Sequence, residues 1–442
     1  LVCRLLLEKK KKFSDRLTNG ITVTIQGEDR DCFYIDFNKV WENNDFIVTR
    51  QYWVQGEKMV KTDCVLLVNG IPLVPIEAKQ RARKGTNWLE GVRQFSTYQI
   101  RAAKLFSCHA FGVACNGHLM KAGIPGATAA YFNEWKDTTI DVSCDNPLLN
   151  ISNGICGIKE IDGFKHMDID TVERMKRGIV GMLQPARVLD IIKNFIVFER
   201  SQEHGVVKKV ARYQQLRAAN KIVERVIASN LDKGVIWHTQ GSGKSLTMLF
   251  TAYKLRNAEE LNDPTVYIVV DRKDLKEQIG GTFDDCEFPN TSVPTNIGQL
   301  KAKIKDKPAE VIITTVQKFQ DLGDVKDDRH NVIVLIDEAH RSQYGDFQTE
   351  MMAVLPNAKR FAFTGTPIPK THRVFSPKDG KEVEYYLDQY SIKDAIEDGA
   401  TVKIRYTFGP QEWFLNKEQL KEGWENITAE LSEDEKRSVE RR

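Results

Sequence analysis

The strongest constraint on the fold is a glycine-rich loop between an apolar run and a helix. The loop His238-Thr-Gln-Gly-Ser-Gly-Lys-Ser245 follows the apolar run 234–237, and a helix is expected to start near Ser245. Glycines let backbone N–H groups surround a phosphate, and the positive end of the helix dipole favours an anion there. Because the loop needs a strand before it and a helix after it, the sequence predicts an α/β fold with a parallel sheet.

Apolar runs and helical patterns alternate after residue 231, as a parallel sheet wrapped by helices requires. The later apolar runs lie at 266–270, 311–314, 332–336 and 361–364. Ligands of such sheets bind at the carboxyl ends of the strands. The preceding stretch, 181–230, is expected to be mainly helical.

The loop positions have expected roles in binding a nucleotide. Lys244 can reach the β- and γ-phosphates, and the Ser245 hydroxyl can bind Mg²⁺. The rest of the loop is expected to contact the nucleotide through Thr239, Gln240, Gly241, Ser242 and Gly243. One position departs from the common pattern, since His238 stands where that pattern has a glycine. A glycine-rich turn without a ligand is the alternative.

Two acidic residues, Asp337 and Glu338, follow the apolar run 332–336. Acids after a buried strand are costly unless they emerge at its carboxyl end, beside the phosphate loop. We therefore expect Asp337 to hold Mg²⁺ through water and Glu338 to polarise the attacking water. The alternative is a simple loop start.

The pattern Thr-x-Gly-x-Gly-Lys at 239–244 resembles the first motif of superfamily 2 helicases. The segment 362–367 is similar to their motif that links nucleotide state to the second motor lobe, which implies roles for Thr364 and Thr366. The segment 212–215 is similar to their adenine-reading element. That resemblance implies an adenine contact from Gln215, with Gln214 as the other candidate and an amphipathic surface helix as the alternative. Two further strand-end segments resemble DNA-backbone motifs, and their candidates for phosphate contact are Arg272, Thr315 and Gln317.

A second group of charged residues lies in the segment 62–79, which is expected to form two strands joined at Asn69-Gly70. Asp63 opens the first strand, and Glu77 and Lys79 close the second. The carboxylates can bind a metal, and the ammonium can orient or help deprotonate a water. A salt-bridged hairpin without chemistry is the alternative.

The register of this hairpin decides whether the two acids share a metal. In a regular two-residue hairpin Asp63 pairs with Ile76 and lies on the wrong face for Glu77. The sequence therefore predicts a bulge or a longer turn, with Pro72 or Pro75 as a plausible place.

Gln94 and Tyr98 are spaced to lie on one face of the following helix. Asp, Glu-x-Lys and Gln-x-x-x-Tyr resemble the core of restriction-endonuclease-like nucleases, which implies catalytic roles for Asp63, Glu77, Lys79, Gln94 and Tyr98. Followed by a superfamily 2 motor, this order resembles the R subunit of type I restriction-modification enzymes. The resemblance implies an α/β architecture, a restriction-endonuclease-like domain followed by a RecA-like motor lobe. The expected divisions are an endonuclease domain at 1–180, a helical connector with the adenine-reading element at 181–230, a first ATPase lobe at 231–395 and the start of a truncated second lobe at 396–442.

The same resemblance implies ATP and Mg²⁺ as cofactors, translocation and cleavage of double-stranded DNA, and specificity and methylation subunits as partners. Two alternatives stay open: a helicase or remodeller whose front domain binds DNA without cutting, and a front domain that serves mainly as an assembly surface. With one lobe only, the chain alone is expected to bind ATP weakly and hydrolyse it little.

Bulk composition neither demands nor excludes a nucleic-acid partner, because 64 basic residues nearly balance 61 acidic ones. No apolar run approaches the roughly 18 residues of a membrane span, so no membrane association is expected. The eight cysteines show no Cys-x-x-Cys spacing, which favours a reduced cytoplasmic setting. Both ends of the sequence resemble cuts inside a longer protein.

Overall fold

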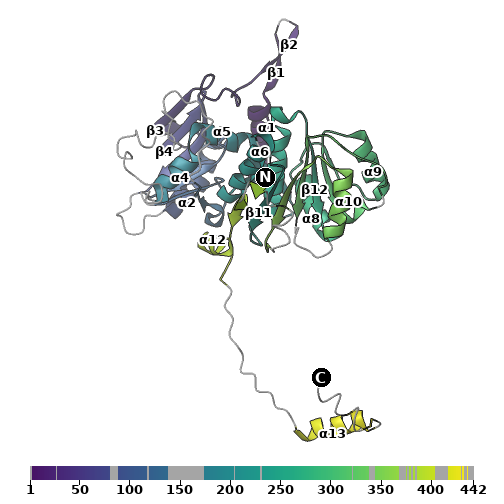
Figure 1. Ribbon diagram of the computed structural model, residues 1–442. Helices are drawn as coiled ribbons and strands as arrows, with labels where there is room; N and C mark the ends of the chain where they lie inside the picture. Colours follow the sequence, from purple (N-terminus) through teal and green to yellow (C-terminus); the bar gives the residue numbers. More distant parts are fainter. Residues whose placement is uncertain are drawn as a thin grey trace. The chain divides into compact units, whose positions relative to one another are not determined.

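The protein is represented by a computed structural model that divides into two compact units, Leu1–Thr401 and Val402–Arg442. In the second unit, helix α13 spans Lys417–Thr428. Two large sheets organise the first unit (Figure 1). No helix in the described part of the chain is both long and apolar enough to cross a membrane. The structure describes residues 2–25, 27–79, 88–116, 119–137, 174–203, 205–228, 231–320, 322–337, 344–367, 375, 378–379, 382–383, 386–403, 417–429, 431–432 and 436.

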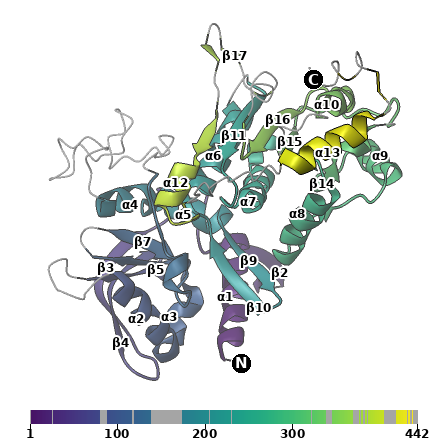
Figure 2. The ribbon, with the colours of Figure 1, turned by 90° about the horizontal axis from the view of Figure 1, so that it is seen from below.

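The N-terminal sheet has the strand order β3-β4-β5-β6-β7-β8 and is antiparallel except for the parallel pair β5 and β6. Helices α2 (Trp88–Arg101) and α3 (Ala103–Cys108) lie beside it (Figure 2). Phe95 of α2 is fully buried and stacks on Phe132 with ring centroids 6.2 Å apart. The strands are β3 (Phe46–Val54), β4 (Val60–Val68), β5 (Ile71–Ala78), β6 (Gly112–Cys115), β7 (Met120–Gly123) and β8 (Asn133–Glu134).

The second sheet is parallel throughout, with the order β13-β14-β12-β15-β16-β11-β19. Its central strand β15 is buried along its whole length, as expected for a sheet covered on both faces. The predicted α/β fold with a parallel sheet is therefore confirmed. The strands are β11 (Lys233–His238), β12 (Thr265–Val270), β13 (Thr291–Ser292), β14 (Val311–Thr315), β15 (Val332–Asp337), β16 (Lys359–Thr364) and β19 (Asp388–Tyr390).

Helices connect these strands and cover the sheet (Figure 1). The connecting helices are α7 (Lys244–Arg256), α8 (Lys273–Asp285), α9 (Ile297–Asp306) and α10 (Tyr344–Val354), while α6 (Tyr213–Ala228) precedes β11 and α12 (Ile392–Glu397) follows β19. The remaining helices are α1 (Val2–Asn19), α4 (Arg174–Met182) and α5 (Pro185–Asn194), and the small hairpins are β1 (Ile21–Ile25) with β2 (Glu28–Cys32) and β17 (Lys378–Asp379) with β18 (Glu382–Val383).

The stretch 181–230 is less helical than the sequence predicted. Between α5 and α6 it contains the antiparallel hairpin of β9 (Ile196–Ser201) and β10 (Gly205–Val210). The cause is the density of β-branched residues in these two segments, which favour strands. In this hairpin the buried Lys208 donates a 2.7 Å hydrogen bond to the carbonyl of His109, which ties it to the N-terminal domain.

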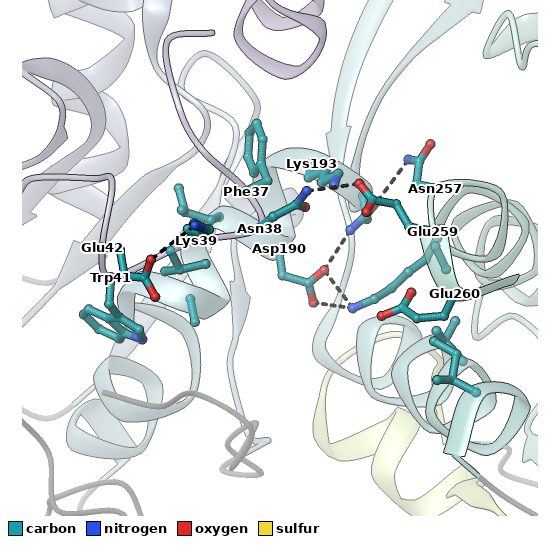
Figure 3. A pocket seen from close by; sticks show the side chains of 18 residues that line it. Phe37, Asn38, Lys39, Trp41, Glu42, Asp190, Lys193, Asn257, Glu259 and Glu260 are labelled. Carbon is teal, nitrogen blue, oxygen red and sulfur yellow. Dashed lines mark hydrogen bonds and ion pairs between the residues drawn. The ribbon is translucent and has the colours of Figure 1, made fainter. Parts of the chain in front are cut away.

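A cavity of about 610 Å³ lies between residues 37–42 and helices α5 and α7 (Figure 3). Asp190 on its wall accepts two hydrogen bonds of 2.8 Å from Lys254, near the end of α7. Asn194 and Asn220 also donate to its carboxylate, at 2.9 and 3.3 Å. The cavity thus lies at the end of α7 opposite to the glycine-rich loop.

Candidate functional sites

The hairpin of β4 and β5 contains the irregularity that the sequence predicts. Near the turn, Leu67 pairs with Pro72, but beyond it Leu66 pairs with Val74, so Leu73 is an extra residue. Cys64 then pairs with Ile76. Continuing this register by one residue puts Asp63 opposite Glu77, as a shared site needs.

The three charged side chains of the hairpin meet at its open end. Lys79 Nζ lies 3.0 Å from Glu77 Oε2 and 3.4 Å from Asp63 Oδ2. The backbone N–H of Ala78 donates to the same Asp63 oxygen at 2.9 Å. The exposed fraction is 1% for the Glu77 side chain, 11% for Lys79 and 40% for Asp63, so the site is open on the Asp63 side.

The electrostatics of this site suit a cation. Burial and the charge of Asp63 raise the pKa of Glu77 to about 7, against the opposing effect of Lys79. Burial acts to lower the pKa of Lys79, but its bond and attraction to Glu77 outweigh burial and raise that pKa. Glu77 Oε1 is buried and has no hydrogen-bond partner among the described residues. A buried carboxylate oxygen without a donor is a suitable ligand for a divalent metal.

Helix α2 packs closely against Glu77 at Gly91, which was not among the predicted site residues. A Cβ on Gly91 would lie 3.1 Å from Glu77 Cβ and 3.2 Å from Ala114 Cβ. One turn later, Gln94 Oε1 is buried without a described partner. Tyr98 donates to the carbonyl of Lys61 at 3.2 Å, and burial, then the charges of the two acids, raise its pKa to about 12. A glycine inside an amphipathic helix was the available signal for this close packing.

The glycine-rich loop has the geometry of a phosphate cradle. Gly241 and Gly243 have φ angles of 79° and 86°, in the left-handed region that favours glycine. Helix α7 begins at Lys244, one residue before the expected start. After β16, Gly365 comes so close that a Cβ there would lie 3.5 Å from Lys244 Nζ. The fully buried Thr364 accepts a 3.1 Å hydrogen bond from the backbone N–H of Thr366. Because these two threonines flank Gly365, both lie close to the Lys244 end of the glycine-rich loop.

Gln215 is tied to the loop in this structure. Its Oε1 accepts from the backbone N–H of Arg212 at 2.9 Å, and its Nε2 donates to the carbonyl of Gly243 at 3.2 Å. Its neighbour Gln214 is 1% exposed, and neither atom of its amide has a partner among the described residues. Gln215 therefore braces the loop, while Gln214 retains unused hydrogen-bonding capacity.

Asp337 ends β15 and is buried, with Phe363 of β16 as its register partner. Strands β15, β16 and β11 are neighbours, so Asp337 is at the same carboxyl edge as the loop. The predicted catalytic Glu338 lies outside the described residues.

Of the three residues predicted to contact DNA phosphates, the structure brings two together. Thr315 and Gln317 line one cavity of about 680 Å³, and Gln317 Nε2 donates to the carbonyl of Asp271 at 2.8 Å. Arg272 does not line this cavity, since it precedes α8 as an exposed residue. Two lysines that were not among the predicted DNA contacts, Lys273 and Lys318, do line it.

A buried network that no sequence pattern indicated lies at the start of the glycine-rich loop. His238 Nε2 lies 2.8 Å from Asp388 Oδ2, and both side chains are completely buried. The two residues are 150 positions apart, and β19 brings them together by pairing with β11. No local pattern could have indicated this contact.

Comparisons with known proteins agree with the order of the two sites. A family model described as SWI2/SNF2 ATPase matches residues 214–437, just over half of the chain. A second, described as type I restriction enzyme R protein N terminus, matches residues 2–129.

Curated relatives cover nearly the whole chain. The type I restriction enzyme HindI endonuclease subunit of Haemophilus influenzae is 32% identical over 467 residues, covering 98% of this chain and 42% of that protein. The putative type I restriction enzyme MjaVIIIP endonuclease subunit of Methanocaldococcus jannaschii is 30% identical over 471 residues, covering 97% and 42%. The chain therefore spans less than half the length of these relatives.

One solved structure is a nuclease-deletion mutant of the Type ISP restriction-modification enzyme LlaGI in complex with a DNA substrate mimic. It is 17% identical with a TM-score of 0.32, covering 50% of this chain and 22% of that one, and this score is too low for an argument about the fold. The family models carry the assignment. The chain belongs to the SWI2/SNF2 ATPase family, and its front part is that of a type I restriction R subunit, which confirms the resemblance seen in the sequence.

Proposed function

We propose that this chain contains the nuclease and the first motor lobe of an R subunit that translocates double-stranded DNA with ATP and cleaves it away from the recognition site. The observation that best supports the nuclease half of this proposal is the bulge at Leu73, which brings Asp63 opposite Glu77 and beside Lys79. A hairpin needed only for stability has no use for a register shift that buries a carboxylate. The nucleotide loop in the same unit supplies the motor half of the proposal.

At the nuclease site, Asp63 and Glu77 would hold Mg²⁺. The unpartnered buried Oε1 of Glu77 fits such a ligand. When bound, the metal would polarise the scissile phosphate. Lys79 would orient the attacking water, and Gln94 and Tyr98 would support the site from helix α2.

At the nucleotide site, the backbone from Thr239 to Gly243 would surround the phosphates of ATP and Lys244 would neutralise them. Ser245 and Asp337 would hold Mg²⁺, and Glu338 would polarise the attacking water. Gln215 is proposed for the adenine contact, and Thr364 and Thr366 for coupling the nucleotide to motor movement.

The proposed contacts to the phosphates of double-stranded DNA come from Arg272, Thr315 and Gln317. Such contacts position the duplex without reading its sequence. Sequence recognition would come from specificity and methylation subunits. A cytoplasmic location also remains a prediction of this function.

The test uses the whole protein assembled with its partner subunits, plasmid DNA carrying an unmodified site, ATP and Mg²⁺. We expect Lys79→Ala to abolish cleavage and retain DNA-stimulated ATP hydrolysis, and Lys244→Ala to abolish both. A wild-type complex that hydrolyses ATP but never cuts DNA would favour the remodeller alternative. Cleavage by Lys79→Ala at the wild-type rate would exclude this residue from the nuclease site.

A further inference from the structure

The first position of the phosphate loop holds a side chain that needs a fixed partner. His238 is 0% exposed, and its Nε2 is the ring nitrogen facing a carboxylate, which can only accept. Burial lowers the pKa of His238, although the bond to Asp388 opposes this, so the ring is neutral with its proton on Nε2. This orientation fixes the residue where β11 turns into the loop.

Asp388 is the centre of the contacts around this histidine. Arg217 binds its carboxylate through two nitrogens, at 2.7 and 3.1 Å, and Lys221 Nζ lies 3.0 Å from Oδ1. Burial acts to raise the pKa of Asp388, but the bonds from His238 and Arg217 outweigh it and hold that pKa well below the ordinary range. The carboxylate is therefore charged in the folded protein, which requires this full set of donors.

The cations come from the helix that also contacts the end of the loop. Arg217 and Lys221 lie four residues apart on one face of α6, and Gln215 of the same helix donates to the carbonyl of Gly243. The backbone N–H of Thr239 donates to the carbonyl of Tyr390, two residues after Asp388, at 3.0 Å. Helix α6 and strand β19 thus hold the loop at its first residues and at its last glycine.

We propose that Asp388 is a positioning residue for nucleotide binding. It holds the phosphate loop in place through His238, and it holds helix α6 against the loop through Arg217 and Lys221. The proposal rests on the proposed nucleotide site. It explains why a histidine replaces the usual glycine, since the ring provides the contact through which a strand distant in sequence holds the loop.

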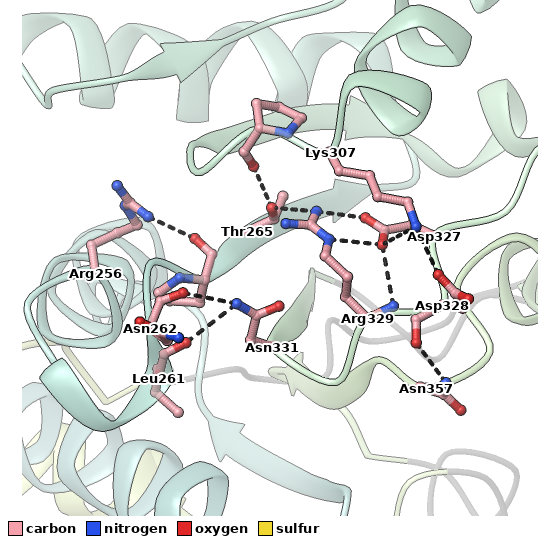
Figure 4. A network of polar contacts seen from close by, with 12 residues as sticks. Arg256, Leu261, Asn262, Thr265, Lys307, Asp327, Asp328, Arg329, Asn331 and Asn357 are labelled. Carbon is pink, nitrogen blue, oxygen red and sulfur yellow. Dashed lines mark hydrogen bonds and ion pairs between the residues drawn. The ribbon is translucent and has the colours of Figure 1, made fainter.

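A matched control lies at the amino end of strand β12 in the same sheet, where Figure 4 shows Arg329 between Asp327 and Thr265. The Asp327 side chain is also 0% exposed and is also bound by two nitrogens of one arginine, Arg329, at 2.9 and 2.6 Å. Arg329 also donates to Thr265, the first residue of β12. Asp327→Asn therefore removes an equivalent buried charge far from the loop.

The experiment measures binding of a fluorescent, non-hydrolysable ATP analogue with Mg²⁺ to the whole protein, together with the melting temperature. We expect Asp388→Asn to weaken binding about tenfold per folded molecule, because a charge-assisted contact to the loop is lost. Asp327→Asn should lower the melting temperature similarly and bind with wild-type affinity. Equal affinities of the two variants would overturn the positioning role and leave Asp388 a stabilising residue.

Substitutions at His238 keep the proposal testable if Asp388→Asn does not fold. His238→Gln retains an N–H donor near the position of Nε2 and should bind clearly better than His238→Leu; equal binding by both would contradict the proposal. Lys244→Ala identifies failure of the nucleotide site itself. If wild type and Lys244→Ala bind equally poorly, the proposed function fails, whereas loss in Lys244→Ala without any effect of Asp388→Asn defeats only this inference.

Discussion

Lys79 Nζ lies 3.0 Å from Glu77 Oε2, at a carboxylate whose side chain is only 1% exposed. The ammonium offsets only part of the effects of burial and of Asp63, so the pKa of Glu77 remains raised, at about 7. Near neutral pH this carboxyl group is partly protonated, and a divalent cation must compete with that proton.

Metal affinity should therefore depend on pH near neutrality. Calorimetric titration with Mn²⁺ should show binding that tightens from about pH 6 to pH 8, and Glu77→Gln should weaken binding and flatten that dependence. Without metal, the folded pKa lies above the ordinary 4.5, so ionising Glu77 costs stability as pH rises from 4.5 to about 7. An unchanged pH dependence in Glu77→Gln would show that another group titrates.

Deleting Leu73 should give a regular hairpin that keeps Asp63 opposite Glu77, because Leu73 is the extra residue and the pairs on both sides of it stay the same. We expect the folded deletion variant to retain Mn²⁺ binding. Leu73→Ala is the control, because it keeps the bulge and loses the same fully buried side chain, at a cost of about 2–5 kcal/mol in stability. If the folded deletion variant loses Mn²⁺ binding while Leu73→Ala keeps it, the site needs the bulge itself and the register of Asp63 and Glu77 is not sufficient.

Gly91→Ala should impair cleavage and spare ATP hydrolysis. The added Cβ would lie 3.1 Å from Glu77 Cβ, so helix α2 or the carboxylate must shift. Gly280→Ala in α8 is a suitable control, since its nearest neighbour would be at an ordinary 3.7 Å. That change should stabilise by about 0.5–1 kcal/mol through helix propensity. Cleavage and ATPase assays on the assembled complex compare the two variants, and wild-type cleavage by Gly91→Ala would mean that the contact relaxes without consequence.

Lys318→Ala should weaken DNA binding uniformly across sequences. Lys318 lines the cavity that contains Thr315 and Gln317, and burial, then Lys276 and Lys273, lower its pKa. Removing one phosphate contact should reduce the slope of log affinity against log salt by about 1. Fluorescence anisotropy with duplex DNA at several salt concentrations measures this slope. The exposed Lys326→Ala is the control, and equal slopes for both variants would place the DNA elsewhere.

Asp190→Asn should destabilise the protein at neutral pH by about 1–3 kcal/mol, because charge-assisted hydrogen bonds to its carboxylate are lost. Burial acts to raise the pKa of Asp190, but Lys254 and the neighbouring side-chain amide of Asn194 outweigh it and lower that pKa (Figure 3). The stabilisation is therefore present above the unfolded value near 3.8 and is lost as pH falls through the folded pKa. Denaturant unfolding at pH 7 and in acid should show a difference that shrinks in acid. Asp263→Asn, in an exposed ion pair with Arg256, should change little.

Local patterns were sufficient for the parts of the fold that depend on neighbouring residues. The loop 238–245 predicted its own strand and helix, because a phosphate cradle requires both in fixed order. Parity in the β4–β5 hairpin predicted a bulge, because side chains alternate with a period of two. The hairpin of β9 and β10 was missed because its β-branched segments lie between two helices with a stronger periodic signal.

By itself, the sequence determined which residue types stand at the two sites and in what order, since each motif is contiguous or joined by one turn. Only the tertiary structure decided what surrounds them. Asp388 contacts His238 because β19 pairs with β11, and Gly91 touches Glu77 because α2 packs on β5. Such contacts join elements distant in sequence, and their partners are selected by burial and charge satisfaction in the folded protein, which no local pattern contains.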